Sequence, residues 1–279
     1  MNIGEALEAS VAGGLDRRES RVLLAEASGL SEALVLAYPE KELEAQACAR
    51  FESWVSRRRA GEPLAYLIGW REFFSLKLTV TPAVLVPRSE TELLVELALE
   101  RLPRTSGVCA VDLGTGSGAV AIALKATRPA ARVAGVDLSQ EALEVARGNA
   151  KRLGLDVDFR YGSWFEPIAG ERYDLIVANP PYVALGDPHL ARGDLPKEPR
   201  LALVAGHDGL IALRAIARGA PQHLRQGGWL LLEHGHDQAE SVRGLLAGLP
   251  FEDIVTWPDL AGIARVTGGR YNPDKFTRV

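Results

Sequence analysis

The chain has 279 residues, a net charge of −4 and a hydrophobic fraction of 47%. This length suffices for one large buried core and a small second one, and the acidic balance excludes a general attraction to polyanions such as nucleic acids. No apolar run approaches a membrane span, and the first ten residues lack the apolar core of a signal peptide. We therefore expect a cytoplasmic protein whose two cysteines, Cys48 and Cys109, are reduced thiols.

The first 69 residues have helical patterns and predict a small helical domain. Asp16 with Glu19 is typical of a helix start, and Gly29 of the helix end. Ser31 predicts the start of a second short helix, which ends before Pro39. A third helix is predicted by apolar residues at helical spacing on a face that comprises Leu43, Ala47, Phe51, Trp54, Val55 and Arg58.

Residues 70–87 alternate between apolar and polar side chains, and we expect two short strands there with Thr81-Pro82 between them. This hairpin would link the helical domain to a larger domain over 88–279. In the larger domain strands alternate with helices, and the predicted strands are 108–112, 132–138, 157–161, 173–178 and 229–233. Two final strands, 251–257 and 264–271, are too close in sequence for a crossover helix and should pair antiparallel. The pattern predicts an α/β fold, a doubly wound and mostly parallel sheet that ends in an antiparallel hairpin.

Residues 111–118, VDLGTGSG, follow the first predicted strand of this domain and precede a helix. The glycines allow a ligand to approach the backbone closely, and the helix N-terminus offers free N–H groups. Asp137 ends the next strand about twenty residues later, where a carboxylate can accept both hydroxyls of a ribose. Asp137 is alternatively a helix cap, although Ser139 already provides an N-cap for the following helix.

The glycine spacing is G-T-G-S-G and differs from the G-x-G-x-x-G of dinucleotide-binding enzymes. Asp112, directly before the glycines, would repel a pyrophosphate but would suit a cationic ligand such as S-adenosylmethionine. A structural turn carboxylate is an equally good interpretation of Asp112.

The strand at 173–178 is followed by Asn179-Pro180-Pro181-Tyr182. Two prolines end the strand rigidly, so Asn179 is held at the carboxyl end of a buried strand, where open α/β sheets bind ligands. The Asn179 side-chain oxygen and the Pro180 carbonyl are acceptors, and Tyr182 offers a flat ring. This set suits a planar group that carries an NH2. A Pro-Pro turn that merely ends the strand is the structural alternative.

A long irregular stretch between Pro181 and Gly209 has the length of a lid or binding loop. It contains Asp187, His189 and Asp194, but neither these residues nor the histidines of EHGH (residues 233–236) have a recognised metal-ligand spacing. We interpret them as solvated loop residues and sheet-end histidines, and we expect no metal site.

Several motifs together resemble the HemK/PrmC family, the protein-glutamine N5-methyltransferases that act on peptide chain release factors. They occur in order as GEPLAYLIGWREFFSLKLTVTPAVLVPRSETELLVE, DLGTGSG, GVDLS, GSWFEP, NPPY, EPRLALVAGHDGL and LLLEHG, and they cover nearly the whole chain. Ser89 departs from the family pattern, in which a second proline is common at this position. The family implies a class I S-adenosylmethionine-dependent methyltransferase fold, and the NPPY motif alone would equally fit an N6-adenine DNA or RNA methyltransferase.

The resemblance also implies which residues bind the cofactor and the substrate. S-adenosylmethionine would contact Asp137 through its ribose and Trp164 through its adenine, with the rest of its site formed by Asn179 and by Gly114, Thr115, Gly116, Ser117 and Gly118. Asn179, Pro180, Pro181 and Tyr182 would hold the glutamine of the Gly-Gly-Gln tripeptide in a release factor, with Asn179, Pro180 and Tyr182 as the catalytic residues. We further expect that residues 1–69 recognise the release factor, that nucleic acid and membrane are not bound, and that the protein is a monomer.

Overall fold

The computed structural model describes residues 1–277, which form two compact units. The first unit comprises residues 1–70 together with 191–197, and the second comprises 71–190 together with 198 to the end of the described range. We expect the larger domain to extend to residue 279, and its last two residues lie outside the described residues 1–277. No helix within residues 1–277 is both long enough and apolar enough to cross a membrane.

The first unit is helical, as the sequence predicts. Its helices are α1 (Ile3–Ala12), α2 (Arg17–Ser28), α3 (Glu32–Ala37), α4 (Ala45–Arg59) and α5 (Leu64–Ile68). The predicted ends of α2 and the start of α3 are confirmed. Asp16 accepts hydrogen bonds from the first-turn backbone of α2, Gly29 ends that helix in a left-handed conformation, and Ser31 caps α3. The core of the unit is apolar and includes Ile3, Leu23, Leu24, Val35 and Phe51.

Arg58 belongs to the predicted face of α4 but forms an ion-pair network. Its guanidinium donates to both carboxylate oxygens of Glu19 at 2.9 Å and to Asp194 Oδ1 at 2.6 Å. Asp194 is therefore a structural partner of the helical unit, and our interpretation of it as a solvated loop residue is wrong. These contacts explain why residues 191–197 group with the helices although they are distant in sequence.

The two-stranded hairpin consists of β1 (Trp70–Phe73) and β2 (Leu76–Thr79). Its turn is at Phe74 and Ser75, which have positive φ angles of 49° and 60°, so the prediction of Thr81-Pro82 between the strands is wrong. Tight hairpin turns of this hand usually contain Gly or Asn, and neither is present here. The Thr81 carbonyl instead accepts a hydrogen bond from the Val84 amide, in a turn that follows β2.

The main sheet has seven strands in the order β5-β4-β3-β6-β7-β9-β8. Their bounds are β3 (Cys109–Leu113), β4 (Arg132–Asp137), β5 (Asp158–Tyr161), β6 (Tyr173–Ala178), β7 (Leu224–Glu233), β8 (Phe251–Pro258) and β9 (Ala264–Tyr271). Strands β3 to β7 are parallel, whereas β9 is antiparallel to both β7 and β8. The predicted parallel sheet with a reversed C-terminal hairpin is confirmed.

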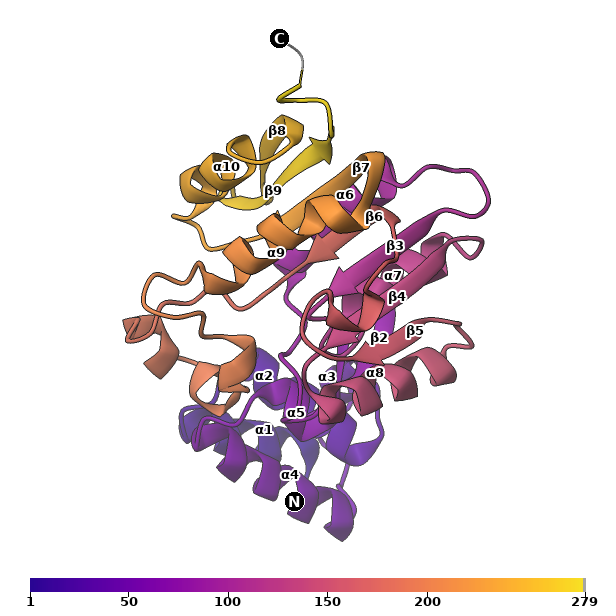
Figure 1. Cartoon of the computed structure of the whole chain (residues 1–279). Helices are drawn as coiled ribbons and strands as arrows, with labels where there is room; N and C mark the ends of the chain where they lie inside the picture. Colours follow the sequence, from indigo (N-terminus) through magenta and orange to yellow (C-terminus); the bar gives the residue numbers. More distant parts are fainter. Residues whose placement is uncertain (278–279) are drawn as a thin grey trace. The chain divides into compact units, whose positions relative to one another are not determined.

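Helices cover both faces of this sheet because its central strands are apolar on both sides. Residues of α6 (Glu92–Arg101), α7 (Ala119–Thr127) and α8 (Gln140–Arg152) share a core with Ala110 and Leu175, and residues of α9 (Ile211–His223) and α10 (Ala239–Ala247) share another with Val111 and Ile176. In Figure 1, α9 lies along one face of the sheet.

The remaining short helical segments are 3-10 turns. They are η1 (Ser89–Thr91), η2 (Glu166–Ile168), η3 (Pro188–Ala191), η4 (Leu195–Lys197) and η5 (Arg200–Ala202).

From β3 the chain proceeds outward to β4 and β5, and then returns to β6 on the other side of β3. The carboxyl ends of β3, β4 and β6 therefore lie at a topological switch point, the place where open α/β sheets bind ligands.

Candidate active site

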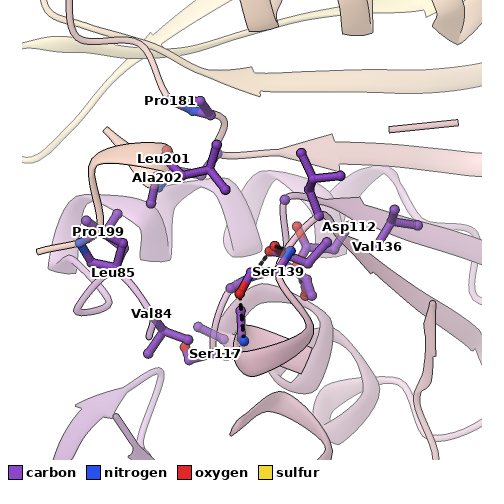
Figure 2. Close-up of a pocket in the computed structure, with 18 of the residues that line it drawn as sticks. Val84, Leu85, Asp112, Ser117, Val136, Ser139, Pro181, Pro199, Leu201 and Ala202 are labelled. Atoms are coloured by element: carbon purple, nitrogen blue, oxygen red, sulfur yellow. Dashed lines mark hydrogen bonds between the residues drawn. The ribbon is translucent and has the colours of Figure 1, made fainter. Parts of the chain in front are cut away.

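The second unit contains a cavity of about 240 Å³ at this switch point. Residues after β3, β4 and β6 line it together with two further segments, 83–91 and 199–202. Figure 2 shows Leu201 and Ala202 near Pro181, and Asp112 and Ser139 in another part of the pocket. The site residues that we predicted from separate motifs are thus brought to one pocket, with the exception of Pro180, Tyr182 and Gly118, which are not among its lining residues.

The glycine-rich loop has the backbone conformation that its glycines allow. Gly114, Gly116 and Gly118 have φ angles of 76°, 55° and 82°. A Cβ on Gly118 would lie 2.9 Å from the Ile122 side chain, so this glycine is required for packing at the start of α7. A Cβ on Gly116 would meet no protein atom within 4 Å, so this glycine instead leaves open space above the loop for a ligand.

Asp137 is oriented by the backbone on both sides. Its Oδ2 accepts the Gly116 N–H at 2.8 Å, and its Oδ1 accepts the Ser139 N–H at 2.9 Å. Burial raises the pKa of Asp137, and these backbone hydrogen bonds oppose the rise. Ser139 caps α8 through its own side chain, as predicted, so the Asp137 carboxylate remains available to a ligand in the pocket.

Asp112 meets both interpretations that the sequence leaves open. Its Oδ2 accepts the Thr115 hydroxyl at 2.6 Å and the Ala121 N–H at 3.3 Å, which is a structural role at the start of α7. It also lines the pocket. Burial raises the pKa of Asp112 to about 7, and the nearby charge of Asp137 adds to the rise. Two carboxylates that repel each other across one pocket favour a cationic ligand.

Trp164 lies beside the glycine-rich loop. It has a positive φ of 44°, which is rare for a large side chain and is typical of functional sites. A Cβ on Gly114 would be 3.5 Å from its ring, so the indole and the loop are close neighbours. Trp164 and the exposed Leu138 both line the pocket and together offer an apolar surface for a flat ring.

The Asn179 amide is held at its nitrogen. Nδ2 donates to the Thr91 hydroxyl at 3.0 Å, whereas Oδ1 accepts no hydrogen bond from residues 1–277. Asn179 lines the pocket, so Oδ1 is available there as an acceptor. Within the described range the Pro180 carbonyl also accepts no hydrogen bond. Tyr182 is anchored at both ends, because its hydroxyl lies 3.5 Å from Glu233 Oε1 and its carbonyl accepts the Gln238 side chain at 3.0 Å.

Four polar residues that sequence reasoning did not single out support this pocket. Thr91 and Glu233 contact the NPPY segment. Glu198 is buried and accepts hydrogen bonds from the Val86 N–H at 3.1 Å and from the Arg88 guanidinium. These bonds connect the pocket segment 83–91 to the start of the pocket segment 199–202. Asn149 is fully buried. All but Asn149 lie in the quoted family motifs, whereas Asn149 shows only as a polar residue on an apolar helix face.

Asn149 links the hairpin to the glycine-rich loop. Its Oδ1 accepts the Thr79 N–H at 2.7 Å, and its Nδ2 donates to the carbonyls of Thr79 and Ser117, each at 3.0 Å. These hydrogen bonds connect the end of the hairpin to the glycine-rich loop and stabilise the loop.

The histidines near the site have structural partners. His189 bonds to Asp187, and buried His234 bonds to the Thr267 hydroxyl at 2.8 Å. Within residues 1–277, no cluster of three or more His, Cys, Asp or Glu side chains is arranged to hold a metal ion.

The fold is that of a methyltransferase. The chain is similar to the solved structure of a methyltransferase from Pyrococcus furiosus, with a TM-score of 0.54, 18% identity, and coverage of 80% of this chain and 96% of that one. Residues 89–192 match the methyltransferase small domain, and residues 6–69 match the PrmC N-terminal domain.

Two bacterial proteins of known family are similar to this chain over nearly its whole length. The chain is 47% identical to the release factor glutamine methyltransferase of Vibrio cholerae, over 92% of this chain and 90% of the relative. It is 48% identical to the Xylella fastidiosa protein of the same name, over 95% of this chain and 97% of the relative. The chain belongs to the release factor glutamine methyltransferase family, and the resemblance inferred from the motifs is confirmed.

Proposed function

We propose that this protein transfers a methyl group from S-adenosylmethionine to the side-chain amide nitrogen of the glutamine in the Gly-Gly-Gln motif of peptide chain release factors. The observation that carries this proposal is the Asn179 amide, whose nitrogen is held by Thr91 and whose oxygen is available at the switch point, in a chain of this family. No feature of the pocket favours the adenine-methylating alternative over this one.

The chemistry of the pocket residues fits S-adenosylmethionine. Asp137 would accept the ribose hydroxyls, Trp164 would stack beside the adenine, and open space at Gly116 would allow close backbone approach. The carboxylate of Asp112 lies where positive charge is favoured. The bound cofactor would supply the methyl group as an electrophile.

Positioning is the main task of the NPPY residues. An amide nitrogen is a poor nucleophile because its lone pair is delocalised into the carbonyl. If Asn179 Oδ1 and the Pro180 carbonyl each accept one N–H of the substrate amide, they fix its plane and direct the nitrogen. Such orientation can lower a barrier by roughly 7–11 kcal/mol in favourable cases. Tyr182, anchored at its hydroxyl and its carbonyl, would pack on the amide face and exclude water. Methyl transfer would leave an amide cation that carries the new methyl group and both original protons on nitrogen, and this cation is acidic enough to release one proton to solvent without a dedicated base.

Incubation with labelled S-adenosylmethionine and a purified release factor tests the proposal. Mass spectrometry should place one added methyl group on the glutamine of the Gly-Gly-Gln tripeptide. A release factor in which this glutamine is replaced by glutamate should accept no label. Label on another residue, or only on nucleic acid in a cell extract, would contradict the proposal.

The helical unit is proposed to recognise the release factor away from the tripeptide. A single glutamine offers little surface for discrimination, and specific protein interfaces bury roughly 1,200–2,000 Å² in total. Three large apolar side chains on or directly after α3 are exposed and suit such an interface: Leu34, Leu36 and Tyr38 are 43%, 59% and 50% exposed.

Point variants test this role better than deletion, because deletion would also remove the partner of Asp194. The double variant Leu36→Ser, Tyr38→Ser should raise KM for the whole release factor about tenfold and leave affinity for S-adenosylmethionine unchanged. Leu260→Ser, at an exposed leucine between β8 and β9, is the matched control. An unaltered KM in the double variant would assign this surface another role.

A further inference from the structure

Asn149 lies on the buried face of α8 and is 0% exposed. Its side-chain amide makes every hydrogen bond that its two donors and two acceptor sites allow. Oδ1 accepts the Thr79 N–H at 2.7 Å and the Arg152 guanidinium at 3.1 Å. Nδ2 donates to the carbonyls of Thr79 and Ser117, each at 3.0 Å. The orientation of the amide is therefore determined, because an exchange of Oδ1 and Nδ2 would place donors against donors and an acceptor against carbonyl oxygens.

One of these four hydrogen bonds has a different destination from the others. Two connect α8 to Thr79 at the end of β2, and the bond with Arg152 is made within α8. The fourth ends on the Ser117 carbonyl, in the glycine-rich loop that lines the pocket. Attachment of α8 to the hairpin does not require a bond to this loop, so the fourth bond indicates a role at the pocket.

The loop backbone offers a defined set of N–H groups to a ligand. The N–H of Gly116 bonds to Asp137 and the N–H of Gly118 bonds to the Thr115 carbonyl, both at 2.8 Å, so neither is available. Three residues that line the pocket have a backbone N–H without a hydrogen-bond partner among residues 1–277: Ser117, Ala119 and Val120. The last two belong to the first turn of α7, where such groups have no partner within the helix.

Asn149 determines how the Ser117 backbone is directed. The Ser117 carbonyl and the Gly118 N–H belong to one planar peptide group, which is held by Asn149 at its oxygen and by Thr115 at its nitrogen. Within the described range the Ser117 carbonyl accepts no other hydrogen bond. Since a glycine lies on each side of Ser117, loss of the Asn149 bond would leave this backbone free to rotate.

The available N–H groups require an acceptor on the ligand. Under the proposed function Asp137 accepts from the ribose and Trp164 contacts the adenine, which leaves the amino-acid part of S-adenosylmethionine. The ammonium of that part suits the carboxylate of Asp112. Its carboxylate needs hydrogen-bond donors, and the partial positive charge at the N-terminus of α7 favours an anion.

We propose that Asn149 is a positioning residue for cofactor binding, which acts through the Ser117 carbonyl to direct the loop N–H groups toward the carboxylate of S-adenosylmethionine. The inference rests on the proposed use of this cofactor. Asn149 is not among the residues that line the pocket, so it need not touch the cofactor to have this effect.

The first experiment compares two ligands that share the adenine and the ribose. S-adenosylhomocysteine carries the amino-acid part, whereas methylthioadenosine lacks it. Asn149→Ala should raise Kd for S-adenosylhomocysteine about tenfold, the effect of losing about one hydrogen bond to a charged group, and should change Kd for methylthioadenosine less than about threefold. Isothermal titration calorimetry, at a temperature at which each variant is folded, measures both constants.

Arg152→Ala is the matched control. Arg152 is exposed and donates to Asn149 Oδ1 and to the Lys77 carbonyl. Its removal weakens the attachment of α8 to the hairpin and leaves the bond between Asn149 and Ser117 in place. Both variants should have a lower melting temperature than wild type, but Arg152→Ala should bind both ligands with Kd values within about twofold of wild type.

A measurement on the wild-type protein decides if Asn149→Ala does not fold. In nuclear magnetic resonance spectra of the isotope-labelled protein, the amide resonance of Ser117 should shift when S-adenosylhomocysteine is added and should stay nearly unchanged with methylthioadenosine. A Ser117 resonance that shifts equally with both ligands would overturn the inference.

The outcomes separate this inference from the proposed function. A wild-type protein that binds neither S-adenosylmethionine nor S-adenosylhomocysteine would refute the proposed function itself. If wild type binds them, equal losses of affinity for the two ligands in Asn149→Ala, or no loss for either, would overturn the positioning role. A loss of the same size and ligand selectivity in Arg152→Ala would assign the effect to the hairpin and overturn the route through Ser117.

Discussion

Replacing Asp137 by asparagine should separate cofactor binding from folding. Both carboxylate oxygens already accept a backbone N–H, from Gly116 at 2.8 Å and from Ser139 at 2.9 Å, and each oxygen retains a second lone pair for a ribose hydroxyl. Asparagine keeps one acceptor and places an NH2 group against the other N–H. One charged acceptor for the ribose is lost.

The loss of a hydrogen bond to a charged group is about 1.5–3 kcal/mol. Because 1.4 kcal/mol corresponds to a tenfold change, Kd for S-adenosylmethionine should rise about 10- to 150-fold. Isothermal titration calorimetry at pH 8 is the appropriate assay, since burial raises the pKa of Asp137 and the carboxylate must be ionised. At acid pH wild type loses the same charge, so the difference between the two proteins should shrink.

Asp156→Asn is the matched control, because Asp156 is exposed and lies outside the pocket. A Kd within twofold of wild type for Asp137→Asn, with one cofactor bound per chain, would refute the assignment of Asp137 to the ribose. A large fall in the melting temperature of the cofactor-free protein would instead indicate that the backbone contacts, and not the ribose, determine the effect.

Three further outcomes are expected. Asn179→Ala should lower kcat on the order of 10²-fold, as removal of a single orienting group does in other enzymes, with a much smaller change in cofactor affinity; turnover within a few-fold of wild type would show that this amide does not orient the substrate. Cofactor affinity should rise as pH increases through about 7, because Asp112 loses its proton there and then attracts a cationic ligand, and calorimetry on Asp112→Asn should show a weaker dependence. Gly209→Ala should reduce kcat and destabilise the protein by about 1–3 kcal/mol. Gly209 has a φ of 71°, and the added Cβ would lie 2.3 Å from the Tyr182 carbonyl oxygen. Denaturant unfolding and activity that both match wild type would contradict this expectation.

Local signals in the sequence determine the elements and the two central motifs. Asp16 and Ser139 were recognisable as helix caps because the groups that they bind are two or three residues away. The strand before Asn179 was recognisable because a central parallel strand is apolar on both faces. Asp137 and Asn179 each lie at the carboxyl end of a predicted parallel strand. Because these ends meet at one edge of an open sheet, the sequence also predicted that the two residues lie at the same edge.

Tertiary packing decided what no local pattern encodes. The hairpin turn occurs at Phe74 and Ser75, which are not the Gly, Asn or Asp residues that usually adopt positive φ angles in such turns, because burial of Phe73 and Leu78 determines the register of the two strands. The partner of the Asn179 amide nitrogen is Thr91, which is 88 residues away and comes from a 3-10 turn with no signal of its own. Hydrogen-bond partners of buried polar groups are selected by the packed fold, because only there are they removed from water and required to find one another.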